Sequence, residues 1–225
     1  MECSRRCSCS EECRNRVVGK GVRVPLCVFY TSDGRGWGVR TVLPLNRGSF
    51  VCEYAGELIS ATEAGVRRRK RARKEEDCAG RGREDESART EKPRAESARS
   101  EGMNFVFTIL EHGSEGILRT TIDPTLRGNV GRYINHSCRP NLAPHLVRVG
   151  SLIPSIAFFC RRDVEAGEEL TFSYHEGIGA SDDGREETAP PSGGQGSDAE
   201  QQRRPCKCGA TNCLGFLPFD PNSDG

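Results

Sequence analysis

The sequence predicts a mainly β protein built from several small sheets. Short runs rich in Val, Ile, Leu, Phe and Tyr alternate with turns marked by Gly, Asn and Ser, which is typical of short strands joined by tight turns. Two long polar stretches interrupt this pattern, and most of the twelve cysteines belong to two groups near the ends of the chain. We therefore expect one β-rich core with polar insertions and with cysteine clusters at both ends.

The first strands follow one another closely in the sequence. Residues 26–30 form an apolar run, and residues 39–43 and 49–54 form two more. The glycine-rich residues 33–38 separate the first pair of runs, and a turn at 46–48 separates the second pair. This region therefore predicts three strands joined by two turns.

The same pattern returns in the second half of the chain. Residues 104–110 and 117–122 predict two strands joined by a turn at 111–114. Residues 142–149 and 156–160 predict two more, on either side of a Gly-Ser turn. The sequence thus predicts β structure on both sides of the first polar stretch.

Two stretches lack the large apolar residues that a packed core needs. Residues 63–74 remain open between a helix and a charged loop, because Gly65 and a block of like charge oppose a helix. Residues 75–102 are mainly Arg, Glu, Ser, Ala and Gly, so burial would not offset the entropy lost in ordering them. We expect a disordered basic and acidic insertion at about 64–102 and a flexible linker at 176–204.

The overall composition fits one soluble domain and does not decide the function. The 225 residues are 35% hydrophobic and carry a formal net charge of +1, which provides no general attraction to nucleic acid. A basic tract at 67–74 is a candidate for local nucleic-acid contact or nuclear import, although a solvated loop explains it equally well. No apolar run approaches the roughly 18 residues of a membrane span, and the charged, Cys-rich start lacks a signal core. We expect no membrane partner.

The cysteine spacing favours metal binding over disulfides. The two thiols of a Cys-x-Cys pair are poorly placed to bridge one another, whereas thiolates on a turn can hold one zinc ion. The rival interpretations are a secreted disulfide protein and, for the last group, a redox pair, which lacks a surrounding βαβ unit. Cys27, Cys52, Cys78 and Cys160 are isolated and are interpreted as core or loop residues. The two groups are Cys3, Cys7, Cys9 and Cys13, and Cys206, Cys208 and Cys213.

Three polar motifs interrupt the apolar runs. Each has a plain structural explanation: a turn, buried polar groups that satisfy the backbone, and a strand. Glycine in the turn would also let a nucleotide-like ligand approach the backbone where a Cβ would block it. The specific feature is the occurrence in one chain of the last two of these motifs followed by the terminal cluster of Cys206, Cys208 and Cys213. The first motif is Arg35-Gly36-Trp37-Gly38, the second is residues 132–141 with Asn135-His136-Ser137-Cys138, and the third is residues 168–174, which end at Tyr174.

Together the motifs resemble those of SET-domain protein-lysine methyltransferases, and among them the suppressor-of-variegation histone methyltransferases. The resemblance covers nearly all of the chain except the two polar stretches. It implies the SET-domain fold, with several small sheets, short helices and a pseudoknot formed by the second and third motifs. It also implies a truncated C-terminal part of a pre-SET zinc module at 1–16, a SET catalytic domain at 17–175, the linker at 176–204 and a post-SET zinc segment at 205–225.

The resemblance also assigns a site for the methyl donor S-adenosylmethionine, with Arg132 as a supporting contact. Phe105 departs from the family, which generally has Tyr at this position. A lost hydroxyl removes one hydrogen bond, worth about 0.5–1.5 kcal/mol if it served binding alone, so this departure leaves a weakened enzyme open. The donor-binding residues that the resemblance implies are Arg35, Gly36, Trp37, Phe105, Arg132, Asn135 and His136.

Tyr174 is the residue that we expect to act in the chemical step. Methyl transfer from a sulfonium to an amine is an in-line displacement, which needs a neutral lysine amine held along the S–C axis in a dry channel. A fixed phenol can orient the amine and stabilise charge, but a phenol with a pKa of about 10 is mostly protonated at neutral pH. We therefore assign positioning to Tyr174 and leave proton removal to solvent.

Phe172 is expected to line the lysine channel. Strand alternation places its ring on the same face as the ring of Tyr174, two residues later. In the resembled enzymes a Tyr at this position restricts the number of methyl groups added, whereas Phe leaves room for a methylated lysine to react again. The resemblance therefore implies at least dimethylation.

For the terminal cysteines the resemblance nominates Cys138 as a fourth zinc ligand. Cys206, Cys208 and Cys213 supply three thiolates, and a structural zinc ion takes four. Such a site has no open position, so this zinc would be structural and would hold the C-terminal segment over the active site. The four N-terminal cysteines match only the last four of the nine in a pre-SET module, and one zinc ion held by four cysteines remains chemically sound there.

The sequence therefore favours an S-adenosylmethionine-dependent methyltransferase that modifies a lysine of histone H3. The resemblance places it in the nucleus, on the chromosome, with the H3 tail or the nucleosome as its partner. The alternative is a catalytically weak SET module that acts as a chromatin-binding scaffold, which Phe105 and the incomplete N-terminal module motivate. Methyl transfer to histone H3 discriminates between the two.

Overall fold

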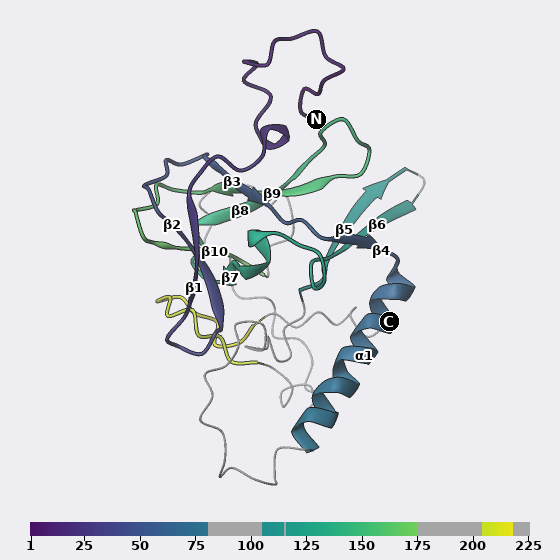
Figure 1. Cartoon of the computed structure of the whole chain (residues 1–225), viewed down its shortest axis with the longest axis vertical. Helices are drawn as coiled ribbons and strands as arrows, with labels where there is room; N and C mark the ends of the chain where they lie inside the picture. Colours follow the sequence, from purple (N-terminus) through teal and green to yellow (C-terminus); the bar gives the residue numbers. More distant parts are fainter. Residues whose placement is uncertain (81–104, 115, 175–203, 218–225) are drawn as a thin grey trace. The chain divides into compact units, whose positions relative to one another are not determined.

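The computed structural model describes residues 1–80, 105–114, 116–174 and 204–217 (Figure 1). The chain divides into two compact units: Met1–Tyr54 with Tyr133–Gly225, and Ala55–Arg132. Most of the predicted linker and the later part of the predicted insertion lie outside the described residues. Within the described part of the chain, no helix combines the length and apolar character that crossing a membrane requires.

A four-stranded sheet in the first unit contains parts of all three motifs. Its strand order is β1 (Leu26–Tyr30), β2 (Trp37–Thr41), β10 (Glu169–Phe172) and β7 (Asn135–His136) (Figure 1). β2 pairs antiparallel with β1 and β10, whereas β7 pairs parallel with β10. The parallel pair places Asn135 opposite Thr171. It therefore joins the second motif to the third.

A second sheet of the first unit contains much of its core. β9 (Ser155–Cys160) lies between β3 (Phe50–Glu53) and β8 (Leu142–Val147) and is antiparallel to both. Ile156, Ala157, Phe158 and Cys160 of β9 are almost completely buried and Phe159 is partly buried, as the uninterrupted apolar run predicts. A short 3-10 helix, η1 (Val18–Lys20), packs Val18 against Phe50 of β3 and Ala157 of β9.

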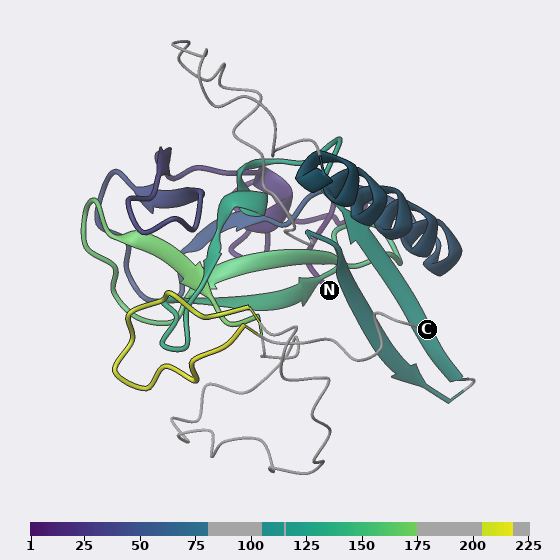
Figure 2. The ribbon, with the colours of Figure 1, turned by 90° about the horizontal axis from the view of Figure 1, so that it is seen from below.

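The second unit combines a three-stranded antiparallel sheet with a long helix. β6 (Gly116–Asp123) lies between β4 (Glu57–Ile59) and β5 (Phe107–Gly113). The helix α1 (Ala61–Gly80) follows β4 and lies beside the β5–β6 hairpin (Figure 2). A 3-10 helix, η2 (Val130–Tyr133), lies where the unit ends.

The structure confirms a mainly β fold of several small sheets. Every apolar run that predicts a strand forms one, although the turn predicted at 111–114 begins too early, because β5 continues to Gly113 opposite Gly116. The apolar pattern misses two short strands, β4 and β7. Each has few residues and is a strand only because it pairs with a distant segment of the chain.

The prediction of a disordered insertion from about residue 64 is wrong for residues 64–80, which belong to α1, a helix of 20 residues rather than a short one. Ser60 caps its start, because its hydroxyl accepts the amide N–H three residues later at 3.1 Å. Arg67 and Arg71 both donate to the carboxylate of Asp123 at the end of β6, at 3.1 and 2.6 Å. These tertiary ion pairs offset the repulsion within the basic block.

Replacing Asp123 should loosen α1 from its sheet. This carboxylate is fully buried and accepts hydrogen bonds from Arg67, Arg71 and Thr125. Asp123→Asn should lower the free energy of unfolding by about 2–3 kcal/mol, because Arg71 loses its ion pair with Asp123 and Arg67 loses one of the three carboxylates that it contacts. Chemical denaturation measures the change. The control Glu63→Gln removes a pair whose carboxylate side is 46% exposed, and should cost about 0.5 kcal/mol or less. Equal costs would contradict this role of Asp123.

Candidate functional site

Glu169 joins the residues of the first two motifs. Its carboxylate accepts two hydrogen bonds from the Arg35 guanidinium, at 3.0 and 2.8 Å, and one from the Asn135 amide at 2.9 Å. Asn135 also donates to the carbonyl of Trp37 at 3.1 Å. The paired, charge-assisted bonds of Arg35 are strong and directional, and the two bonds of Asn135 hold its amide in one orientation. The Glu169 carboxylate thus joins Arg35 to Asn135, and Asn135 in turn contacts Trp37, so three residues predicted to bind the methyl donor lie together.

The two glycines of the first motif have different structural roles. Gly36 has a φ of +85°, a conformation that favours glycine, and a Cβ there would meet no neighbouring atom. At Gly38, within β2, a Cβ would lie 3.0 Å from a carboxylate oxygen of Glu169 and 3.1 Å from the ring of Phe29. Gly36 therefore shapes the turn, and Gly38 makes room for Glu169.

Asn141 holds the third motif against the second. Its side chain is buried, and its amide donates to the Glu168 carboxylate at 2.9 Å and to the Glu169 carbonyl at 2.8 Å. Its side-chain oxygen accepts the amide N–H of Thr171 at 2.9 Å. One side chain therefore satisfies backbone groups of β10 that would otherwise be buried without a partner.

Tyr174 is held at both ends by the second motif. Its backbone N–H donates to Nδ1 of His136 at 3.0 Å, and its hydroxyl donates to the carbonyl of Ile134, also at 3.0 Å. Tyr174 is 37% exposed, whereas Ile134 is almost completely buried. The hydroxyl of Tyr174 therefore points toward the interior, although part of the residue reaches the surface. A phenol fixed in this way has the rigidity that a positioning role requires.

A row of aromatic rings leads from the core to Tyr174. Ring centroids are 6.2 Å apart between Tyr54 and Phe158, 4.8 Å between Phe158 and Phe172, and 4.7 Å between Phe172 and Tyr174. Phe172 is only 4% exposed, so rings on two sides set its position. Its contact with the phenol ring agrees with the alternation that the third motif predicts.

The hydroxyl of Tyr174 is not suited to act as a base. Desolvation raises the pKa of Tyr174 above its ordinary value, and the Arg35 and Glu169 charges act on it in opposite directions. The phenol is therefore neutral at physiological pH. Because its O–H donates to Ile134, the oxygen keeps lone pairs that can accept a hydrogen bond from another group.

Two of the residues predicted to bind the methyl donor lie in the second unit and contact each other. The guanidinium of Arg132 lies over the ring of Phe105, 4.9 Å from its centroid, and donates to the carbonyl of Thr125 at 3.1 Å. Phe105 is buried, so the residue that departs from the family packs as an apolar ring under a cation. The structure therefore shows a packing role for both residues inside this unit.

The four predicted ligands of the terminal zinc site come together. The sulfur atoms of Cys138, Cys206, Cys208 and Cys213 all lie within 4.8 Å of one another, and those of Cys138 and Cys206 are 3.9 Å apart. A tetrahedral zinc ion with Zn–S bonds near 2.3 Å needs sulfurs about 3.8 Å apart, so the set fits one ion. Cys138 belongs to the second motif, and the other three belong to the segment 204–217.

The chain around these thiols supplies further donors. The amide N–H of Leu214 donates to Cys138 Sγ at 3.4 Å. Burial raises the pKa of Cys138. Burial also opposes ionisation of Cys208, but backbone hydrogen bonds and hydrogen bonds from the neighbouring thiols outweigh it and lower the pKa of Cys208 to about 6. Lys207 donates to the carbonyl of Asp33 at 3.2 Å, so this segment, yellow in Figure 1, also contacts the turn before the first motif.

The N-terminal cysteine group comes together in part. The sulfur atoms of Cys3, Cys9 and Cys13 lie within 4.8 Å of one another, whereas Cys7 is exposed and does not belong to this set. Arg16 donates to Cys9 Sγ at 3.4 Å, and this bond lowers the pKa of Cys9. Three thiolates fit a zinc ion that takes its fourth ligand from another group.

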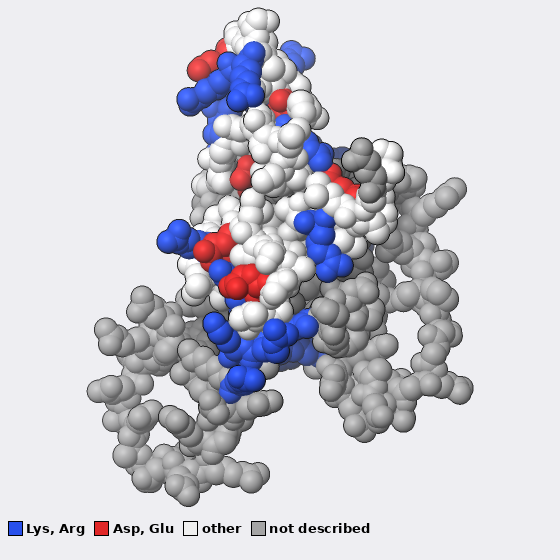
Figure 3. Space-filling model, turned by 90° about the vertical axis from the view of Figure 1, so that its right-hand side faces the viewer, with Lys and Arg blue, Asp and Glu red and all other residues white. Residues whose placement is uncertain are grey.

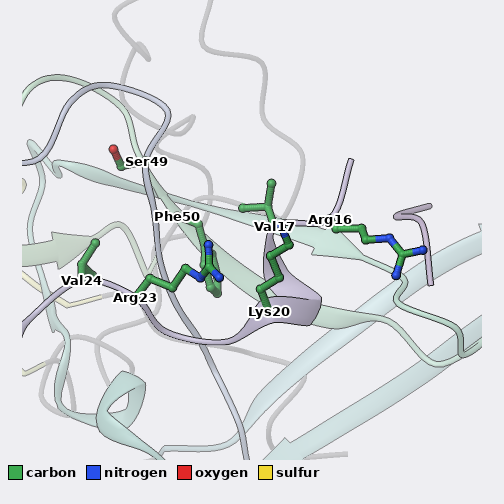
Figure 4. A pocket seen from close by; sticks show the side chains of 7 residues that line it. All are labelled: Arg16, Val17, Lys20, Arg23, Val24, Ser49 and Phe50. Carbon is green, nitrogen blue, oxygen red and sulfur yellow. The ribbon is translucent and has the colours of Figure 1, made fainter. Parts of the chain in front are cut away.

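A separate cavity of about 280 Å³ lies between η1 and β3 (Figure 4). The guanidinium of Arg16 points away from Lys20 and Arg23 toward the N-terminal cysteines. No residue of the three motifs lines the cavity, so it is distinct from the site around Tyr174. Its lining consists of cationic, apolar and hydroxyl side chains: Arg16, Val17, Lys20, Arg23, Val24, Ser49 and Phe50.

Comparison with known proteins identifies the class to which this fold and site belong. The SET domain signature matches residues 36–175, and the chain belongs to the SET domain family. This confirms the resemblance that the motifs indicate.

Among individual proteins, the chain is 36% identical over 230 residues to the histone-lysine N-methyltransferase SETMAR of Rattus norvegicus. This match covers 100% of the chain and 61% of the relative, so the chain spans about three fifths of that protein. The crystal structure of the methyltransferase domain of human SETMAR has a TM-score of 0.66 at 35% identity, covering 97% of this chain and 67% of that one. Arabidopsis thaliana SUVH6 in complex with SAM has a TM-score of 0.63 at 28% identity, covering 96% and 38%.

Sequence analysis missed Glu169 and Asn141, which organise the site. A signal exists for Glu169: alternation along the third motif places it on the face opposite Phe172, and a largely enclosed carboxylate needs a charged partner such as Arg35. Asn141 offers no comparable signal, because its partners include backbone groups of a strand far along the sequence.

Proposed function

We propose that this protein is an S-adenosylmethionine-dependent N-methyltransferase that modifies a lysine of histone H3 on chromatin in the nucleus. The observation that carries the proposal is the convergence of the first two motifs on Glu169, in the strand that leads to Tyr174. The relative named histone-lysine N-methyltransferase and the SAM complex of SUVH6 support the reaction and the donor. The H3 tail and the nucleosome are the proposed partners.

The first two motifs would hold the donor, which supplies a methyl group on a positively charged sulfur. The N–H groups of Asn135 are directed at Trp37 and Glu169, so its side-chain oxygen points away from them and can accept from an amino group of the donor. The ion pair with Glu169 fixes Arg35 beside this position. These contacts would organise the donor site before binding, which would reduce the entropy lost on association.

Tyr174 would orient the lysine amine against the methyl group. Its neutral phenol offers lone pairs to the incoming N–H groups or to the polarised methyl hydrogens, while the bond to Ile134 keeps the oxygen in place. The amine must arrive neutral, because a protonated amine has no lone pair to attack carbon. Its proton is lost to solvent, since the phenol remains protonated.

The test is transfer of a labelled methyl group from S-adenosylmethionine to an array of histone H3 peptides, followed by site-by-site mass spectrometry. We expect the 225-residue protein to modify at least one H3 lysine. Binding of donor and peptide without any transfer would support the catalytically weak scaffold instead. This alternative is retained because Phe105 is buried at a position where the family generally has Tyr.

Phe172 should determine how many methyl groups are added. The ring is packed between Phe158 and Tyr174, so a hydroxyl added to it would enter the space beside the phenol. We expect the unmodified protein to produce at least dimethyl-lysine and Phe172→Tyr to stop mainly at monomethyl-lysine. A mass-spectrometric time course under excess donor measures this. Unmethylated and monomethylated peptides serve as matched substrates, because Phe172→Tyr should make only the monomethylated peptide a poor substrate. A wild-type reaction that ends at one methyl group would refute this role.

α1 provides a second proposed contact with chromatin. In the basic tract at 67–74, Arg67 and Arg71 pair with Asp123, whereas Arg69, Lys70 and Arg73 are exposed. Figure 3 shows Lys and Arg side chains gathered on the surface of this part of the second unit. Exposed cations on one helix suit the phosphates of nucleosomal DNA, and salt-dependent DNA binding tests this contact.

A further inference from the structure

The two ring nitrogens of His136 contact two different parts of the site. Nδ1 accepts the backbone N–H of Tyr174 at 3.0 Å, and Nε2 lies 3.3 Å from the sulfur of Cys138. Because Nδ1 accepts, a neutral ring carries its proton on Nε2, which then donates to the sulfur. The histidine is only 4% exposed, so water does not compete freely for these bonds. One buried ring therefore connects the four-cysteine site with the backbone of Tyr174.

The strength of this connection depends on where the Cys138 sulfur lies. The four-cysteine site, whose sulfurs lie within 4.8 Å of one another, sets that position together with the amide N–H of Leu214, which donates to the sulfur at 3.4 Å. Hydrogen bonds to metal ligands orient both partners. Closure of the four-cysteine site therefore favours the ring orientation in which Nδ1 faces the N–H of Tyr174.

We propose that His136 is a positioning residue that couples closure of the four-cysteine site to the placement of Tyr174. The inference differs from the donor-binding role that the resemblance implies, because both ring nitrogens already contact groups of the protein. It rests on the proposed function for the reaction that Tyr174 serves, but the chain of hydrogen bonds from Cys138 to Tyr174 stands apart from any activity.

Amide hydrogen exchange of the zinc-loaded, full-length protein tests the first link. We expect His136→Phe to accelerate exchange of the Tyr174 amide about tenfold, as loss of one buried hydrogen bond predicts. The Thr171 amide, which is bonded to Asn141, should keep its protection and the terminal site should keep its zinc. The matched control His112→Phe replaces an exposed histidine of β5 and should leave the Tyr174 amide unchanged. Unchanged exchange at Tyr174 in His136→Phe would overturn the proposal.

A second change tests the coupling. Cys208→Ser removes a zinc ligand other than the thiol that His136 contacts. It should accelerate exchange of the Tyr174 amide about tenfold in the otherwise unchanged protein, but no more than about twofold in His136→Phe, where the connection is already lost. Fully additive effects would overturn the coupling.

Two further measurements keep the outcome clear. If His136→Phe loses its zinc or the protection of the Thr171 amide, the variant His136→Gln replaces it as the test, because the amide of Gln can both accept and donate a hydrogen bond. We expect His136→Gln to restore protection of the Tyr174 amide. Failure to do so counts against the proposal. S-adenosylmethionine affinity should change little in His136→Phe while kcat falls, whereas a donor-binding side chain would weaken the affinity. Absence of methyl transfer with the exchange results intact would count against the proposed function alone.

Discussion

Tyr174→Phe is expected to abolish turnover on unmethylated, monomethylated and dimethylated H3 peptides alike while the fold persists. Removal of the hydroxyl takes one hydrogen bond, to Ile134, from the folded protein, a loss of about 1 kcal/mol in stability. Removal of a preorganised group that acts in the transition state costs about 10²–10³-fold in kcat, and the loss of amine orientation adds to it. The chemical step should therefore suffer far more than folding.

The measurement is a mass-spectrometric time course on the three peptides, with thermal unfolding and zinc content recorded for the same preparations. Tyr30→Phe is the matched control, because Tyr30 is 61% exposed on β1 and should tolerate loss of its hydroxyl. Turnover by Tyr174→Phe within about tenfold of the unmodified protein would show that the hydroxyl does not serve the transition state.

Cys138→Ser and Cys208→Ser should each remove the same equivalent of zinc and abolish methyl transfer. The four sulfurs lie within 4.8 Å of one another although Cys138 is far from the other three in the sequence, so one ion joins two segments of the chain. Structural zinc contributes roughly 10–16 kcal/mol of binding free energy in small zinc domains, and loss of one thiolate removes much of it. The segment 204–217 should then detach from the second motif.

Because both changes break one shared site, the double variant should lose little more than either single variant. Metal analysis of the purified proteins decides the stoichiometry, and limited proteolysis near residues 204–217 reports detachment. Cys27→Ser is the control, since this isolated thiol of β1 lies outside both cysteine sets. Retention of the full zinc content in Cys138→Ser would exclude it as a ligand.

These predictions share a structural reason. The third motif is held by several kinds of interaction at once: parallel pairing with β7, the side chain of Asn141, the ion pair of Glu169 with Arg35, and the bonds of Tyr174 to the second motif. Each contact crosses from one segment to another that is distant in the sequence. Single changes should therefore act on the position of Tyr174 before they unfold the domain.

The sequence by itself determined the longer strands and the chemistry of the motifs. In the apolar run 156–160, four of the five side chains are almost completely buried, because burial of apolar surface is the dominant driving force of folding. The cysteine spacing and the resemblance together also indicated the set of Cys138 with the three terminal cysteines, which the structure brings within reach of one ion. Patterns of this kind can be recognised without knowledge of the packing, because they are either local in the sequence or shared by a protein family.

Only the tertiary structure decided which polar side chains meet. Residues 67–74 looked too highly charged for a helix, yet they belong to α1. The reason is that the buried carboxylate of Asp123, at the end of β6, accepts hydrogen bonds from Arg67 and Arg71. β7 is a strand through pairing alone, Glu169 joins two motifs that periodicity treats separately, and His136 faces a thiol and a backbone amide rather than open space. The physical reason is common to all of them: hydrogen bonds and ion pairs act over a few ångströms in space, and their partners lie far apart along the chain.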